Sequence, residues 1–270
     1  MTFDDFARSH GLILDSITPD NWMATRTEDH PNKRNGRYKY LGDVGWVQNW
    51  ATMESPSMWR SDVKGPTVFR IKSDDKERRD AMQKAASKAA WILNQTSLAA
   101  HPYLIRKGFA EERGNVWDVD GKQILVIPMR AEGKLIGCQM IEKEKRFLSG
   151  QKSKGASFVI DAKGFPLFCE GYATGLSVRA AMKAMNIRYT IHICFSASNL
   201  IHIAKGIPGG MVVADSDPVG EKSALDTGKP FWLSDTTGED FNDFHVRVGL
   251  FRASQSLKTA YVASHRASAG

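Results

Sequence analysis

The sequence is poor in cysteine. Its 270 residues include only three, Cys138, Cys169 and Cys194, which lie far apart within apolar segments. No two of them have CxxC spacing, and residues 20–60 contain no cysteine and a single histidine, His30. A structural zinc site needs four clustered Cys or His ligands, so we expect no zinc and three reduced thiols in the core.

Long apolar runs are also missing. No stretch reaches the roughly eighteen apolar residues that a membrane-spanning helix needs. The opening segment, MTFDDFARSH, carries acids where a secretory signal would have basic and then apolar residues. We therefore expect no membrane partner and a cytoplasmic location. The GxxxxGK[ST] motif is absent as well, so the sequence predicts no Walker-type motor of its own.

Positive charge is in excess. The chain has 37 Lys and Arg residues against 30 Asp and Glu, a formal net charge of +7. Its 42% hydrophobic and 25% charged residues are typical of a folded globular protein. The charge favours a polyanionic partner, because phosphates neutralised by Lys and Arg release counterions. Many basic proteins bind no nucleic acid, so charge alone leaves this open.

The first part of the chain predicts a small ribbon-like module. Residues 2–10 have the pattern of a short amphipathic helix, and turn residues then divide the chain into short extended pieces. We expect the tryptophans in this part, Trp46, Trp50 and Trp59, to act as a hydrophobic fastener in place of zinc. Residues 61–73 are typical of a linker, and helix-forming residues with acids at the start predict a helix over 75–97.

Basic and aromatic residues alternate in the segment RNGRYKY. Alternation at period two is typical of a strand with one face toward a partner. Arg34, Arg37 and Lys39, interleaved with Tyr38 and Tyr40, therefore predict a surface for phosphate contact and base stacking on single-stranded DNA. For any one ring in this module, ordinary core packing remains the alternative.

A basic segment follows the long helix. The apolar runs QILVIPMR and KLIGCQMI, separated by AEG, predict a β-hairpin within a small antiparallel sheet. The next stretch, KEKRFLSGQKSKGASFVI, gathers positive charge around two glycines. Lysine and arginine suit phosphate contact, and a solvated loop is the alternative for each single residue. The residues that we expect to grip phosphates are Arg130, Lys145, Arg146, Lys152 and Lys154.

From residue 165 the pattern alternates between strand and helix. FPLFCEG, YTIHICFS and GMVVADSD are typical of buried strands, and the segments between them are typical of helices. Such alternation predicts a parallel sheet. We also expect Asn199 to cap the helix that follows FSAS, and the end of the chain, SHRASAG, to be a frayed tail.

Carboxylates stand at the ends of two of these predicted strands. Glu170 ends LFCE, Asp215 ends MVVAD and Asp217 follows two residues later, while Asp240 and Asp243 lie in the later turn TTGEDFNDF. Ligands collect at the carboxyl ends of parallel strands. Grouped carboxylates suit Mg²⁺ or Mn²⁺, which prefer oxygen ligands. Any one such acid, taken alone, is more often a turn or helix cap than a ligand.

These motifs resemble the Toprim domain of primases and topoisomerases, which has Glu-Gly after one strand and Asp-x-Asp after a later one. The matching segments are CEGYATGLSV, VVADSDPVGEKSA and GEDFND, in family order over about residues 158–246. The preceding segments HPYLIRKGF, ILVIPMRAEGKLIGCQMI and KRFLSGQKSKGASFVI look like the basic subdomain that precedes Toprim in DnaG-type primases. Topoisomerases lack that block, so the resemblance covers about residues 98–246 and points to a primase.

The resemblance implies an α/β fold of four parts. These are a zinc-ribbon-like module without zinc ligands, a small α+β basic primase-core subdomain, a Toprim domain with a central, mainly parallel sheet flanked by helices, and a C-terminal helix and tail. Their ranges are 1–73, 74–157, 158–247 and 248–270.

The implied activity is synthesis of short RNA primers on single-stranded DNA from NTPs. Glu170, Asp215, Asp217 and Asp240 would hold Mg²⁺ or Mn²⁺ for phosphoryl transfer. Whether Glu170 binds metal or handles protons stays open, and we assign it only to the catalytic group. With no motor motif, a replicative helicase would be a separate chain, as in a phage or other mobile element. The alternatives are a Toprim nuclease and a non-catalytic replication or origin-binding protein.

Overall fold

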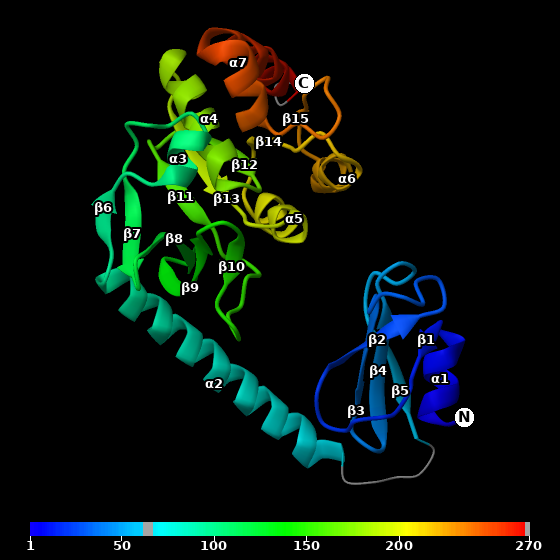
Figure 1. Cartoon of the computed structure of the whole chain (residues 1–270). Coiled ribbons are helices and arrows are strands. Elements are labelled where there is room, and N and C mark those ends of the chain that lie inside the picture. The colour runs from blue at the N-terminus through cyan, green and yellow to red at the C-terminus, as the bar shows by residue number, and fades with distance from the viewer. Residues whose placement is uncertain (62–66, 268–270) are drawn as a thin grey trace. The chain divides into compact units, whose positions relative to one another are not determined.

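The computed structural model describes residues 1–61 and 67–267 (Figure 1). The chain divides into two compact units, Met1–Arg78 and Arg79–Gly270. The described residues form helices and three five-stranded sheets, so the expected mixed α/β class is confirmed. Within the described ranges, residues 1–61 and 67–267, no helix has both the length and the apolar character needed to cross a bilayer.

The first unit is an antiparallel sheet with one helix against it. Helix α1 (Phe3–Ser9) confirms the helix expected over residues 2–10, and Thr2 caps it with Asp5 in a reciprocal capping box. Phe3 and Ala7 of α1 are buried in a cluster with residues of the sheet. The strands, in sheet order, are β1 (Leu12–Ile13), β2 (Met23–Thr27), β3 (Gly36–Tyr40), β4 (Val44–Asn49) and β5 (Ser57–Arg60).

Only part of the expected tryptophan fastener exists. Trp59 is buried in the same cluster as Phe3, and its indole Nε1 donates a hydrogen bond to the carbonyl of Met1 (3.0 Å). Trp46 is half-buried. Trp50 is 49% exposed, because it follows the last residue of β4 at a turn. Burial of α1, together with Trp59, therefore holds this module.

Helix α2 (Thr67–Asn94) confirms the helix expected over 75–97 for residues 75–94, but it begins earlier and ends at Asn94, so residues 95–97 are not helical. Residues 67–73 are helical, so the linker expected over 61–73 is wrong there. The helix begins before the acidic segment, which therefore lies inside the helix and does not mark its start. Residues 62–66 of that linker lie outside the described residues.

The second sheet carries the expected hairpin. Strands β8 (Lys122–Ala131) and β9 (Lys134–Ile141) pair antiparallel around the predicted turn. Ala85, Ala89 and Ile92 of α2 are buried in one cluster with Val126 and Cys138, so the helix covers one face. The sheet also contains β6 (Ser97–Ala99), β7 (Gly114–Val119) and β10 (Lys145–Phe147), and the short helix α3 (Pro102–Arg106) follows β6.

The third sheet has the order β11-β13-β12-β14-β15. Three of its four pairings are parallel, and only the edge strand β11 runs antiparallel to its neighbour β13. The other two sheets are wholly antiparallel. The strands are β11 (Phe158–Asp161), β12 (Phe165–Cys169), β13 (Tyr189–Ile193), β14 (Met211–Val213) and β15 (Phe231–Trp232).

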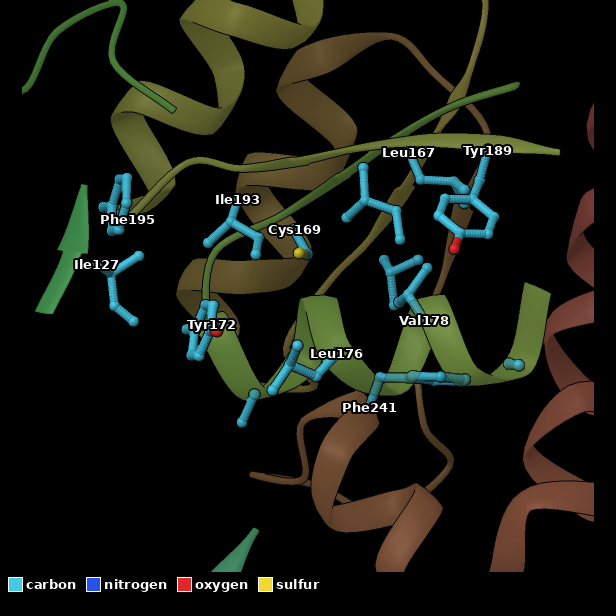
Figure 2. Packing of buried hydrophobic residues seen from close by; sticks show 14 of the residues in the cluster. Ile127, Leu167, Cys169, Tyr172, Leu176, Val178, Tyr189, Ile193, Phe195 and Phe241 are labelled. Atoms are coloured by element: carbon cyan, nitrogen blue, oxygen red, sulfur yellow. The ribbon is translucent and has the colours of Figure 1, made fainter. Parts of the chain in front are cut away.

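Helices cover both faces of the third sheet. On one face, Leu176 of α4 (Tyr172–Ala184) and Phe241 of α7 (Phe241–Ala267) pack with Leu167 and Ile193 (Figure 2). On the other face, residues of α5 (Ala197–Gly206) and α6 (Pro218–Thr227) pack around Phe168 and Val212. Strands buried on both faces explain why they appear in the sequence as continuous apolar runs.

Helix α7 continues through most of the expected tail. It runs to Ala267 with a kink at Gly249, where φ is 81° and ψ is 160°. The frayed tail expected over 264–270 is therefore wrong for residues 264–267, and residues 268–270 lie outside the described residues. The expected boundaries at residues 157 and 247 stay predictions.

Asn199 does not cap α5, as we expected. Ser196 is the N-cap, and its hydroxyl accepts from the Asn199 backbone N–H. The buried Asn199 amide donates to the carbonyls of Ala156 and Cys194 (2.7 Å each), and its oxygen accepts from the Gly155 N–H (2.7 Å). This side chain ties the segment that ends the basic run to the end of β13.

We predict that Asn199→Ala lowers the free energy of unfolding by about 2–4 kcal/mol, because buried backbone groups that lose a partner cost about 1–3 kcal/mol each. Thermal unfolding of the intact chain measures the effect. Asn94→Ala, at an exposed position at the end of α2, is the control and should shift the midpoint little. Equal midpoints for the two variants would show that Asn199 is no internal tie.

Candidate carboxylate site

The acidic residues identified from the sequence lie at one edge of the third sheet. Glu170 directly follows β12, and Asp215 comes two residues after β14, the parallel neighbour of β12. Asp217 is the N-cap of α6, and Asp240 immediately precedes α7. The carboxyl ends of parallel strands meet at the same edge of a sheet. Segments that are far apart in the sequence are thereby brought together.

The carboxylates at this edge repel one another. Burial, and then the charges of Asp240, Glu170 and Asp217, raise the pKa of Asp215 to about 7. Burial first, and then the charge of Asp217, also raise the pKa of Glu170. Such shifts arise where acids are taken out of water beside like charges. The edge therefore favours a proton or a cation.

The chemistry of the site fits a divalent cation. The Oδ1 atom of Asp215 is buried and has no hydrogen-bond partner within the described chain. An uncompensated carboxylate oxygen beside further carboxylates is the donor set that Mg²⁺ and Mn²⁺ prefer. Within residues 1–61 and 67–267, however, no three His, Cys, Asp or Glu side chains lie close enough together to hold a metal ion as they stand.

Gly220 allows the turn that carries the two aspartates to be tight. A Cβ atom at this glycine would lie 2.2 Å from the carbonyl oxygen of Asp215, so no other residue fits without a shift of backbone. The Gly220 N–H donates to Oδ1 of Asp217 (2.7 Å). Asp217 is therefore a helix cap, which is the alternative that its sequence position left open, and its second carboxylate oxygen is left for other ligands.

A hydrogen-bond network that the sequence did not suggest holds this turn. The Ser216 N–H donates to the carbonyl of Glu239 (3.1 Å), and the Gly238 N–H donates to the carbonyl of Ser216 (2.6 Å). The Ser216 hydroxyl accepts from the Ser234 N–H (2.7 Å) and donates to the Ser234 carbonyl (3.1 Å). The loop after β14 is thus bound to the loop after β15, next to Asp240.

The side chain of Glu239 anchors that second loop. Arg247 of α7 donates two hydrogen bonds to the Glu239 carboxylate, from Nε (2.6 Å) and Nη2 (2.8 Å), and Ser234 donates a third. The bonds from Arg247 hold the pKa of Glu239 below its usual range. Glu239 is therefore a positioning residue, and the only sequence signal for it is that it adjoins Asp240.

Of the basic residues expected to grip phosphates, Lys145 is the one whose charge acts on the carboxylates. Its positive charge lowers the pKa of both Glu170 and Asp215, against the effect of burial. Lys145 begins β10, and successive side chains of a strand point to opposite faces. Its neighbour Arg146 instead pairs with Glu144 at 3.6 Å, and both side chains are exposed.

The other expected phosphate-binding residues are exposed but are not placed at the carboxylates by any contact described here. Arg130 donates to the carbonyl of Gly133 (3.3 Å), across the turn of the hairpin. Lys152 and Lys154 are exposed in the segment before β11. Their contact with phosphates stays a prediction.

The basic residues of the first unit have a different surrounding from the one expected. Arg37 lies over the exposed Trp22 ring (4.4 Å to its centroid) and donates to Gln48. Tyr38 is 4% exposed and donates to the carbonyl of Ser16 (2.9 Å), so its ring is not available for base stacking. Arg34 is exposed and Lys39 is half-buried. DNA contact by Arg34, Arg37 and Lys39 stays a prediction.

Asp243 does not join the site. Its carboxylate pairs with Lys107 at 2.9 Å, and its backbone N–H donates to Oδ1 of Asp240 (2.8 Å). The adjacent Asn242 is buried and donates to the Lys107 carbonyl and the Ser177 hydroxyl. Asp243 and Asn242 therefore hold the start of α7 in place. Of the acids in this turn, Asp240 is the one whose charge acts on Asp215.

No known family model and no curated protein matches the chain. The interpretation of this site therefore depends on its geometry and on the motifs in the sequence.

We predict that Asp215→Asn stabilises the metal-free protein at high pH. The folded-state pKa of Asp215 is raised to about 7. The folded protein therefore has its full stability below the unfolded pKa, where Asp215 is protonated, and loses stability as pH rises through about 7. An uncharged Asn avoids this loss. At about 1.4 kcal/mol per pKa unit, the gain at pH 8.5 is on the order of a few kcal/mol. Unfolding midpoints in a chelator, at pH 5 and pH 8.5, measure it.

The gain should be smaller at pH 5 than at pH 8.5. Asp118→Asn, at an exposed position on β7, is the control and should change stability little at either pH. A wild-type protein more stable than Asp215→Asn at pH 8.5 would contradict the electrostatic account of the site.

Proposed function

We propose that the chain is a DNA primase that makes short RNA primers on single-stranded DNA, with a Toprim fold in residues 158–247. The observation that supports this most is the convergence of Glu170, Asp215 and Asp240 at the ends of neighbouring strands and loops, where their charges act on one another. The parallel strands with helices on both faces are in keeping with such a fold.

Glu170, Asp215, Asp217 and Asp240 would hold Mg²⁺ or Mn²⁺ in this proposal. When bound, the cation supplies positive charge to nucleotide phosphates and to the oxygens of the transferred group. The unpaired Oδ1 atom of Asp215 is the first ligand that we propose. Asp217 keeps one oxygen on the first turn of α6, which fixes the direction of the other.

The chain's own residues contribute charge and position. Lys145 places a positive charge beside Glu170 and Asp215, and so attracts the polyphosphate of an NTP to the metal ligands. Glu170, whose pKa is raised by burial, is also suited to hold a proton near the reacting hydroxyl. The network of Ser216, Glu239 and Arg247 keeps the aspartate turn in place.

The partners in this proposal are a single-stranded DNA template, NTPs and a helicase on a separate chain. The antiparallel sheet before the site brings Lys145 to the carboxylates and carries Arg130 and Arg146, and Lys152 and Lys154 follow it in the chain. A positively charged surface next to a metal-binding edge suits a template and a triphosphate together. This surface favours a primase over a Toprim nuclease that uses the same carboxylates.

The direct test is template-dependent synthesis. The intact protein is incubated with labelled NTPs, mixed single-stranded templates and Mg²⁺ or Mn²⁺, and we expect short oligoribonucleotides that need both template and metal. Glu170→Gln, Asp215→Asn and Asp217→Ala should each reduce the product by about 100-fold or more, because each removes a carboxylate that would hold the cation. Asp226→Asn, which alters an exposed acid of α6 paired with Lys222, is the matched control.

Three outcomes would overturn the proposal. Folded protein that gives no product on any template is not a primase. Metal-dependent cleavage of DNA without nucleotides would identify a nuclease. Salt-sensitive DNA binding that is unchanged by metal and by the three substitutions would identify a non-catalytic binding protein.

A further inference from the structure

An exposed aromatic ring lies beside the candidate site. Phe147, the last residue of β10, is 43% exposed although its side chain is large and apolar. It pairs with the buried Gln139 of β9, while Lys145 pairs with the buried Ile141. Because side chains two residues apart in a strand share a face, Phe147 and Lys145 point to the same side. Lys145 acts on Glu170 and Asp215 from that side.

Phe195 connects this ring to the backbone of the site. The two rings meet edge to face, with centroids 6.3 Å apart and an interplanar angle of 87°. Phe195 is 7% exposed, and its backbone N–H donates to the carbonyl of Glu170 (3.0 Å). Figure 2 shows its ring next to Ile127, in the cluster that joins the second and third sheets. Phe147 therefore has a fixed neighbour on one side and solvent on another.

The backbone of Phe195 is itself strained. Its φ is 68°, in the left-handed region that a bulky side chain seldom adopts. Strain of this kind persists where the surroundings hold it and is common at functional sites. Here it lets one residue bond the Glu170 carbonyl and turn its ring toward Phe147.

We propose that Phe147 is a stacking platform for the base of the incoming nucleotide, whose phosphates lie at Lys145 and the carboxylates. The inference deepens the proposed function and rests on it. Stacking on an exposed ring suits any of the four bases, since each has a π-face. A sequence-tolerant contact of this kind would suit a primase that takes all four NTPs at one site. Phe195 then serves as the positioning residue that orients Phe147.

The test separates the base from the phosphates. Binding of ATP and of inorganic tripolyphosphate to the intact protein is measured by calorimetry in Mn²⁺ without template. Phe147→Ala should weaken ATP binding by about tenfold, within the range for loss of one stacked base, and should leave tripolyphosphate binding unchanged. Phe251→Ala, at a 76% exposed phenylalanine of α7, is the matched control and should change neither.

Two further variants guard against a folding defect. Phe147→Leu keeps apolar volume without a π-face and should behave like Phe147→Ala, whereas Phe147→Trp should bind ATP at least as tightly as the wild type. Fluorescence of the new indole should also be quenched by ATP and not by tripolyphosphate.

The inference is wrong if Phe147→Ala binds ATP normally, or if it loses ATP and tripolyphosphate equally. A loss confined to binding of a single-stranded oligonucleotide would assign the ring to the template and overturn its assignment to the incoming nucleotide. These outcomes differ from failure of the proposed function, in which wild-type protein makes no primer at all.

Discussion

The mutual repulsion of carboxylates at the edge of the third sheet is the constraint around which the site is built. Burial of Asp215, together with the like charges of Asp240, Glu170 and Asp217, raises the pKa of Asp215 to about 7. A folded chain keeps such an arrangement only if other contacts hold it. Here backbone hydrogen bonds between the turns at Ser216 and Glu239 do so. In the proposed function, a bound cation would relieve the repulsion that these bonds hold in place.

The parallel arrangement of strands makes this possible. Neighbouring strands β12 and β14 end at the same edge, so residues from distant parts of the chain meet without long loops. Helices on both faces exclude water from the strands. Burial therefore raises the pKa of Asp215 together with the repulsion between the carboxylates. The second sheet packs into the same core through Ile127 of β8 and Ile141 of β9. This packing brings Lys145 and Phe147 of β10 to the carboxylate edge of the third sheet.

The sequence was informative about elements and about the acids that end them. Alternation of apolar strands and helices predicted β12, α4, β13, α5 and β14 in order, because burial on two faces leaves a direct mark on composition. The positions of Glu170 and Asp215 followed from strand ends alone. Whether the arrangement is a Toprim fold and whether these residues catalyse stay predictions.

What the sequence could not give were bonds between distant side chains. Asn199 looked like a cap because caps are local, but its partners Gly155 and Ala156 lie more than 40 residues away. Glu239 and Arg247 likewise carry no motif of their own. The alternation that grouped Tyr38 with Arg37 could not show which face of β3 is covered by α1, and so Tyr38 was misjudged.

The central proposal is that the carboxylate edge binds a divalent cation, and Mn²⁺ binding to the intact protein tests it most directly. Electron paramagnetic resonance of free Mn²⁺ at pH 8 gives the affinity and stoichiometry. The account predicts saturable binding that Asp215→Asn and Glu170→Gln each weaken at least tenfold. Binding that is absent in the folded wild-type protein, or equal in all three proteins, would contradict it.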